Sequence, residues 1–276
     1  MTTTDGSEVG DEPSEPLETG WLDGTPVDDS LLRRFVIGFG EWIETSARAA
    51  GHAVLRTDDV VAVDEHADHK LLNCGILLRP LTAERAGELL ADLTGFYTGA
   101  GAPFSLFSPW PADVPGLVIG GHPPVMLRMP GNVPAGAGDA AGLDVREVTT
   151  RALLAEYERV LVEGFPLDSL ATDRGGVALH PSSLHVPGMR MFVGLVDGRG
   201  VTGATSILGH GVNHVEWVAT LDAARGKGYG AAITWAATLV DPALPALLVA
   251  SDLGRPVYER MGYVVLDRWT FLVGTR

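Results

Sequence analysis

Two basic residues and three glycines stand close together in the segment ATLDAARGKGYGAA, which covers residues 219–232. Glycine lets a backbone approach a ligand without a Cβ in the way, and the unpaired N–H groups that open a helix attract anions. Arg225 and Lys227 add positive charge there, in a chain whose formal net charge is −15. The glycines are Gly226, Gly228 and Gly230. The segment therefore predicts a binding site for an anion such as a diphosphate.

Three other interpretations of this segment compete. A P-loop requires Ser or Thr after its lysine, and Gly228 follows Lys227, so that pattern fails. A dinucleotide site is favoured by the preceding strand and by Asp252 further on, but the spacing is G-x-G-x-G rather than G-x-G-x-x-G. The chain after Gly230 is also too short to complete such a sheet, although a circularly rearranged sheet stays open. A glycine-rich turn with solvated charges is the third alternative.

The elements around this segment alternate between strand and helix patterns. NHVEWVATL precedes it as a strand, GAAITWAATLV follows as a helix, and ALLVAS is the next strand. Upstream, TTRALLAEYERVLVEG predicts a helix and Asp197-Gly198 predicts the turn of a hairpin. The expected fold class is α/β (α+β), a mixed central sheet flanked by helices, with the glycine turn at a strand-to-helix junction.

The order R-x-x-G-x-G, formed by Arg225, Gly228 and Gly230, resembles the acyl-CoA signature of the GNAT superfamily of N-acyltransferases. A second motif follows in the expected order: SDLGRPVYERMGY, residues 251–263, is similar to the family's later motif of a polar strand end, Tyr, and Gly-aromatic. The resemblance covers about residues 142–276. It implies acetyl-CoA as cosubstrate and an amine as acyl acceptor.

The resemblance also implies which residues contact acetyl-CoA. Backbone amides of the glycine turn would hold the diphosphate, and the preceding strand would lie along the pantetheine arm. Ser251 stands where Asn is more usual, which puts one hydrogen bond to the arm in doubt. The residues assigned in this way are Val218, Thr220, Arg225, Gly226, Lys227, Gly228, Tyr229, Gly230, Ala231 and Ser251.

Three residues are candidates for catalysis. The resemblance implies that Tyr258 protonates the departing thiolate. An alkyl ammonium cannot attack, so a base must take its proton, directly or through water. Strand alternation puts His214, Glu216, Val218 and Thr220 on one face of the strand. Either His214 or Glu216 could be that base. The competing interpretations are ordinary ones, polar residues on a half-exposed strand for His214 and Glu216 and a core helix residue for Tyr258.

The chain divides by composition into four parts. Residues 1–24 are acidic and predict a disordered tail, residues 25–130 a degenerate GNAT-like domain, residues 131–142 a linker, and residues 143–276 the catalytic domain. The first half repeats the order of strands and helices of the second but has no glycine turn. We expect it to pack beside the catalytic half and to wall the acceptor pocket.

Composition limits the partners. The excess of acidic residues opposes nucleic acid and anionic membranes and suits a cationic or neutral substrate. The acidic N-terminus and the lack of a long apolar run predict a cytoplasmic protein. Cys74 is the single cysteine and is expected to be a buried, inert thiol. The run DEHADH, residues 64–69, has metal-capable side chains, but its spacing favours a solvated loop, so no metal is expected.

The expected function is an N-acetyltransferase that moves an acetyl group from acetyl-CoA directly to a primary amine of a small molecule or a peptide. Direct transfer is favoured because Cys74 lies outside the second half. The alternative is a non-catalytic acyl-CoA-binding regulatory module. An oligomer is possible, and the sequence does not predict its state.

Overall fold

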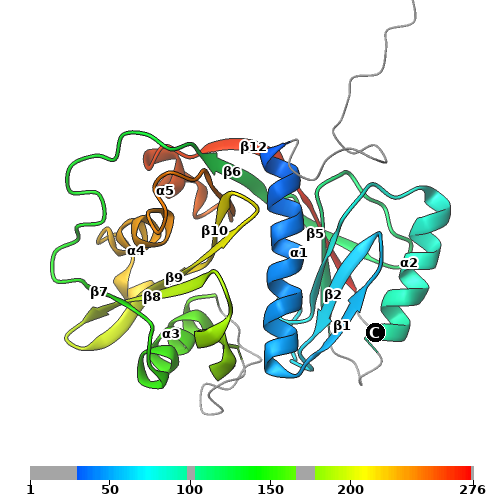
Figure 1. The fold of residues 1–276 in the computed structure, drawn as a ribbon, viewed down its shortest axis with the longest axis horizontal. Coiled ribbons are helices and arrows are strands. Elements are labelled where there is room, and N and C mark those ends of the chain that lie inside the picture. The colour runs from blue at the N-terminus through cyan, green and yellow to red at the C-terminus, as the bar shows by residue number, and fades with distance from the viewer. Residues whose placement is uncertain (1–29, 98–102, 166–177, 275–276) are drawn as a thin grey trace, which may run out of the picture.

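The computed structural model describes residues 30–97, 103–165 and 178–274, which form two mixed sheets flanked by helices (Figure 1). The expected mixed α/β class is confirmed. The first sheet has the order β1-β2-β3-β4-β13-β5 and the second the order β12-β6-β11-β10-β9-β8-β7. The strands of the first sheet are β1 (Ala53–Arg56), β2 (Val60–Asp64), β3 (Cys74–Leu77), β4 (Phe104–Ser108), β5 (Val118–Gly121) and β13 (Thr270–Gly274). Those of the second are β6 (Pro124–Arg128), β7 (Asp144–Glu147), β8 (Met189–Val196), β9 (Arg199–Gly209), β10 (Val212–Thr220), β11 (Ala246–Val249) and β12 (Val264–Arg268).

Two strands join the sheet of the opposite half of the chain. β6 comes from the first half and lies between β11 and β12, antiparallel to both. The C-terminal strand β13 lies between β4 and β5 of the first sheet. The backbone crosses between the sheets at residue 123, whose carbonyl accepts a hydrogen bond from the Trp269 amide at 3.1 Å. The division of the chain at residues 131–142 stays a prediction, and sheet membership does not follow it at these two strands.

Helix α1 (Leu31–Ala50) stands between the two sheets (Figure 1). Ser30 caps its start by accepting a hydrogen bond from the Arg33 amide, and Gly51 ends it with φ of 82°. Its buried face belongs to a core that also contains Val61 and Ile76 of the first sheet and Val212 and Leu247 of the second. Trp269 is fully buried in the same core. α1 therefore holds the two sheets at a fixed position relative to each other.

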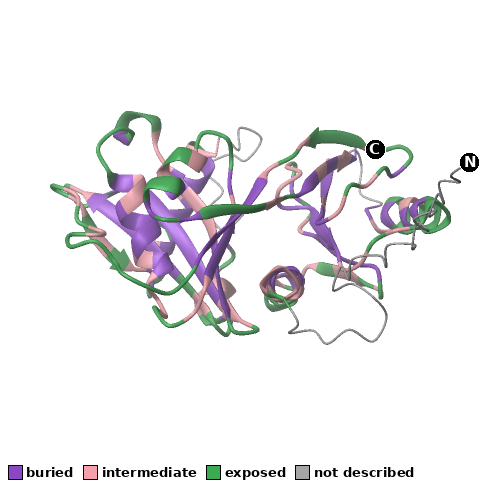
Figure 2. Ribbon diagram, turned by 90° about the horizontal axis from the view of Figure 1, so that it is seen from above, coloured by how far each residue is buried: buried purple, intermediate pink, exposed green. Residues whose placement is uncertain are grey.

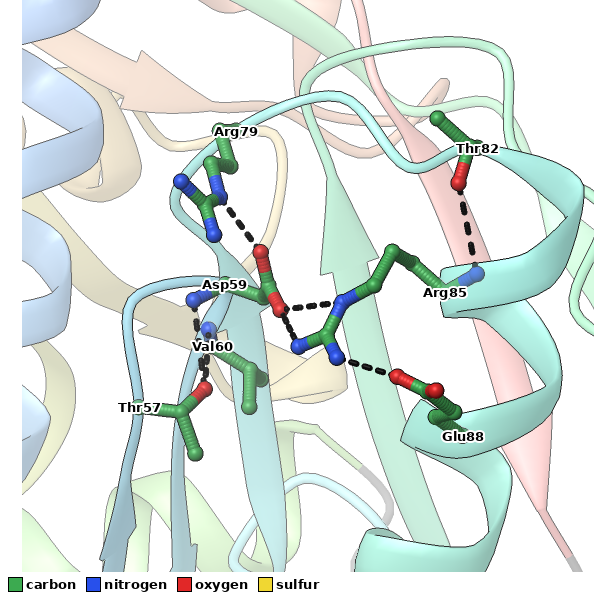
Figure 3. Close-up of polar contacts among 7 residues, drawn as sticks. All are labelled: Thr57, Asp59, Val60, Arg79, Thr82, Arg85 and Glu88. Carbon is green, nitrogen blue, oxygen red and sulfur yellow. Dashed lines mark hydrogen bonds and ion pairs between the residues drawn. The ribbon is translucent and has the colours of Figure 1, made fainter. Parts of the chain in front are cut away.

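Helix α2 (Ala83–Phe96) packs on the other face of the first sheet, over a core that includes Leu77, Leu93 and Leu106. Thr82 caps it by accepting a hydrogen bond from the Arg85 amide. The buried carboxylate of Asp59, in the β1–β2 turn, accepts hydrogen bonds from Arg79 and Arg85 (Figure 3). These contacts tie the first turn of α2 to the end of the β1–β2 hairpin.

Helices cover both faces of the second sheet. α3 (Arg151–Gly164) packs on one face, and α4 (Tyr229–Thr238) and α5 (Arg255–Arg260) pack on the other. Two short 3-10 helices, η2 (Pro181–His185) and η3 (Asp222–Ala224), complete the described elements. Figure 2 shows the buried residues concentrated along the sheets and the helix faces that contact them. None of the described helices has the length and apolar character that crossing a membrane requires.

The two halves share one arrangement of elements. In the first, β3 pairs parallel with β4 and α2 connects them; in the second, β10 pairs parallel with β11 and α4 connects them. The order that the sequence comparison of the halves predicts is therefore present. The acidic N-terminal tail lies outside the described residues.

Candidate active site

The second sheet opens between β10 and β11. These strands pair only at Asn213 with Ala246 and at His214 with Leu247. Beyond them, β11 is held by β6 on its other side, up to the hydrogen bond from the Ala250 amide to the Pro124 carbonyl. From Val215 onward, the edge of β10 that faces β11 has no strand partner in the described part of the chain. Its backbone groups are therefore available to an extended ligand.

A β-bulge interrupts β10 where the strands separate. Glu216 pairs with Thr205 of β9 and Ala219 pairs with Gly203, so β10 has one residue more than β9 between these two pairs. Trp217, within the bulge, has φ of 51°. Tyr157 is a fully buried residue of α3. Its hydroxyl donates a hydrogen bond to the Trp217 carbonyl at 3.1 Å and lies 2.7 Å from Thr205 Oγ1. Tyr157 thus holds the bulge in place.

The bulge corrects the expected alternation along this strand. Trp217 packs with the cores under α1 and α3, while Val218 packs with Val215 in the core under α4. Val218 therefore lies on the opposite face from His214, because the extra residue reverses the alternation after Glu216. Alternation from the sequence put Val218 and Thr220 on the face of His214, and that prediction is wrong.

A cavity of about 460 Å³ lies where β10 and β11 separate. Both halves of the chain line it: Phe39 and Trp42 of α1 come from the first half, and Glu216 and Trp217 of β10 from the second. Phe271 of β13, a second-half residue in the first sheet, lines it as well. The second half contributes three more of the predicted site residues, which are Val218, Ser251 and Tyr258. The structure therefore brings Glu216, Val218, Ser251 and Tyr258 together around one space.

Glu216 is the carboxyl group of β10 at this cavity. Its Oε1 atom is buried and has no hydrogen-bond partner in the described part of the protein. Burial raises the pKa of Glu216 to about 8. A carboxyl with this pKa exchanges protons near neutral pH and can act as a general base.

Tyr258 lies on α5, close enough to Glu216 to sense its charge. Burial raises the pKa of the Tyr258 hydroxyl, and the Glu216 carboxylate raises it further. The hydroxyl thus keeps its proton and can serve as an acid. Ser251 accepts a hydrogen bond from the Gly254 amide at 3.1 Å, which holds the turn that starts α5.

His214 lies away from the cavity. Its ring is fully buried, stacks on Phe35 of α1 at 4.7 Å between centroids and lies against Gly38. Burial lowers the pKa of His214 to about 3, with a smaller contribution from His210. A neutral ring among apolar side chains suits packing between α1 and the second sheet. Of the two candidate bases, only Glu216 lines the cavity.

The glycine turn follows β10 and leads into α4. Residues 225–228 are exposed, Gly226 and Gly228 have φ of 76° and 83°, and no side chain caps α4. The first backbone hydrogen bond of the helix runs from Ala232 to Gly228. In the described chain the amides of residues 226–231 have no acceptor, and Lys227 has no ion-pair partner. This is the arrangement of a helix start that can bind an anion.

The other predicted cofactor residues surround this turn. Arg225 pairs with Asp222 at 2.7 Å and remains half exposed. The Tyr229 hydroxyl donates to the Ala141 carbonyl at 3.2 Å, which holds the predicted linker against α4. Thr220 Oγ1 lies 2.8 Å from Thr202 Oγ1, beside Gly230, and does not line the cavity.

The sequence predicts that the first half walls the acceptor pocket, but it does not predict which side chains of that half line the cavity. The sequence predicts a solvated loop at Glu65, but Glu65 is half-buried and lines the cavity, and burial raises its pKa to about 8. Cys74 is buried as predicted, but it also lines the cavity, so the second half is not the only source of side chains there. Burial raises the pKa of the Cys74 thiol, which keeps it protonated and a poor nucleophile. Among the described residues, no group of three His, Cys, Asp or Glu side chains could hold a metal ion.

Comparison with known proteins supports the fold. No family model and no curated protein matches the chain. A GCN5-related N-acetyltransferase from Kribbella flavida superposes with a TM-score of 0.60 and 20% identity, over 85% of this chain and 95% of that one. A putative GNAT-family acetyltransferase from Novosphingobium aromaticivorans gives 0.54 and 18%, over 85% and 96%. A GCN5-related N-acetyltransferase-like protein from Streptococcus suis gives 0.52 and 17%, over 89% and 98%.

Proposed function

We propose that this chain, whose fold is that of the GCN5-related N-acetyltransferases, is an acetyltransferase that moves an acetyl group from acetyl-CoA to a primary amine. The observation that carries the proposal is the glycine turn. Its free amides lie at the end of the strand whose open edge lines the cavity with Glu216 and Tyr258. A diphosphate bound at the turn could extend its thioester arm along β10 toward these two side chains. We place the reaction in the cytoplasm, where acetyl-CoA is available.

The side chains support direct transfer. Glu216 takes a proton from the ammonium of the acceptor, because its raised pKa brings its basicity closer to that of an amine. The amine nitrogen then forms a bond to the thioester carbonyl carbon and loses its second proton to solvent, and the carbon–sulfur bond breaks. The departing thiolate takes a proton from the Tyr258 hydroxyl, which is later replaced from solvent. The products are an N-acetyl amine and CoA.

Calorimetric titration tests the cofactor, and a Tyr258→Phe variant tests the chemistry. We expect acetyl-CoA and CoA to bind and NADH not to bind. We expect Tyr258→Phe to keep its CoA affinity while the release of CoA thiol from acetyl-CoA falls by about 10²-fold or more, the usual size of an acid–base contribution. Glu259→Gln, an exposed change at the next residue of α5, is the control that should leave both quantities unchanged.

Two results would contradict the proposal. Binding of NADH with no response to acetyl-CoA or CoA would indicate a dinucleotide site at the glycine turn. Binding of acetyl-CoA without turnover on any amine, in the parent protein as in Tyr258→Phe, would indicate a non-catalytic acyl-CoA-binding module.

A further inference from the structure

The walls of the cavity favour one charge and one kind of surface. The described residues that line it include no Lys or Arg, but they include three acidic residues, Glu65, Glu216 and Asp252. The rest of the wall is mostly apolar and rich in aromatic rings. The rings belong to Phe39, Trp42, Phe107, Phe165, Trp217 and Phe271, in addition to Tyr258. An anionic acceptor would find no Lys or Arg to pair with among these residues, and an acceptor with many hydroxyls would lose hydrogen bonds to water without replacement.

Glu65 is a second carboxyl group at this space, supplied by the opposite half of the protein. It follows the last residue of β2, and its carboxyl has no hydrogen-bond or ion-pair partner in the described chain. Glu216 reaches the cavity from β10 of the other sheet. Cys74 lies where the charges of both carboxylates act on it, since Glu65 and Glu216 each raise the pKa of its thiol. The two carboxyl groups therefore face a common region from different walls.

An unpaired carboxyl in an apolar wall needs a ligand to explain it. The mechanism proposed above uses Glu216 and leaves Glu65 without a role. A half-buried carboxyl that meets no donor loses part of its hydration, and a bound cation would return part of that free energy. Aromatic rings around the space also accept cations on their faces.

We propose that Glu65 binds a second cationic group of the acceptor, so that the acceptor is a small diamine with an apolar spacer. This inference rests on the proposed function. One amino group lies at Glu216 and becomes acetylated, the other lies at Glu65, and the spacer contacts the aromatic wall between them. The first half of the protein thereby determines which amine is accepted. Glu65 is a specificity residue in this arrangement and takes no part in bond making.

A binding experiment without turnover tests the inference independently of catalysis. Linear α,ω-diaminoalkanes of four to eight carbons are titrated against the protein and compared with amino alcohols of the same length. Trp42 and Trp217 line the cavity and provide the fluorescence signal. For at least one length we expect the diamine to bind about tenfold tighter or more, because one charged hydrogen bond contributes about that much.

Two variants identify the residue responsible. In Glu65→Gln, which preserves shape and removes charge, we expect the preference for the diamine over the amino alcohol to disappear. In Asp68→Asn, an exposed acidic neighbour in the same turn, the preference should persist. Calorimetry in two buffers of different ionisation enthalpy measures the protons released when the diamine binds, and we expect Glu65→Gln to release fewer than the parent. The pKa of Glu65 is raised to about 8, so in the parent this carboxyl is partly protonated near pH 7.5 and loses its proton when a cation binds.

The outcomes separate this inference from the proposed function. Equal affinity for diamine and amino alcohol at every length, or a preference that survives Glu65→Gln, would overturn it. Suppose that the parent and Glu65→Gln acetylate simple monoamines with the same kcat/KM and that neither prefers a diamine. That result would support the proposed acetyltransferase and refute the proposal that its acceptor is a diamine. Diamine preference without any turnover would support the binding site and contradict the enzyme.

Discussion

The substitution Glu216→Gln should make the protein more stable at pH 8 and change little at pH 4. The carboxyl has an ordinary pKa of 4.5 when unfolded, and burial raises the pKa to about 8 in the folded protein. Below pH 4.5 it is protonated in both states, so it costs nothing. Between pH 4.5 and pH 8 the unfolded chain releases the proton while the folded protein keeps it, so the free energy of unfolding falls as pH rises. Above pH 8 the penalty is constant.

The size of the effect follows from the change in pKa. At 1.36 kcal/mol per pKa unit, a rise from 4.5 to about 8 corresponds to about 5 kcal/mol of stability lost at pH 8. Water that enters the cavity reduces this figure, because the effective dielectric constant of protein sites is about 20 rather than 4. We therefore expect Glu216→Gln to exceed the parent in stability by about 2 to 5 kcal/mol at pH 8.

Urea unfolding at pH 4.5, 6, 7 and 8.5 measures this difference for Glu216→Gln against the parent. Asp113→Asn, an exposed acidic residue in a loop of the first half, is the control and should track the parent at every pH. Glu65 titrates over the same range but is common to the parent and Glu216→Gln, so its contribution cancels in the difference. A difference in unfolding free energy that stays constant from pH 4.5 to pH 8.5 would refute the burial argument for Glu216.

Two further predictions concern the glycine turn and the core. Gly228→Ala should lose about 1 kcal/mol of stability, because the φ of 83° at this position is unfavourable for any residue with a Cβ, and CoA should bind this variant more weakly in calorimetry. The control Gly87→Ala, at an exposed position within α2, should instead gain about 0.5 to 1 kcal/mol. Equal effects of the two changes on stability would contradict the left-handed backbone at Gly228. His214→Leu should reduce the loss of stability that the parent shows as pH falls. Burial holds the pKa of His214 at about 3, so below pH 6.5 the unfolded chain takes up a proton that the folded protein does not, and the free energy of unfolding decreases. Chemical unfolding from pH 7 to pH 4 measures this, and identical slopes for variant and parent would count against a buried neutral ring.

Local signals in the sequence predicted the helices and turns well. Ser30, Thr82 and Thr150 cap the helices that begin directly after them, and each accepts a hydrogen bond from the amide three residues on. Gly51 ends α1 in the left-handed conformation, as expected of a glycine after a helix. These features depend on residues within one turn of each other, so the sequence alone contains them.

The shape of the site depends on contacts that a sequence pattern does not contain. The bulge at Trp217 carries no glycine to signal it and is held by Tyr157, sixty positions away along the chain. Glu65 appears polar and loop-like in the sequence, and only the packing of α1 and the second sheet against β2 encloses it. The partners of β6 and β13 were also hidden, because an apolar strand fits either of two sheets equally well by pattern.

Because β6 and β13 each lie in the sheet of the opposite half, neither half of the chain forms a complete sheet without the other. A chain cut within residues 131–142 would leave the half with the glycine turn lacking the strand that joins β11 to β12, and would leave β4 and β5 with no strand between them. Deleting only the last few residues would damage the half in which the chain begins. Because β4 and β13 lie more than 160 positions apart, we expect β13 to complete the first sheet late in folding. Nascent chains that lack it should expose the unpaired edges of β4 and β5.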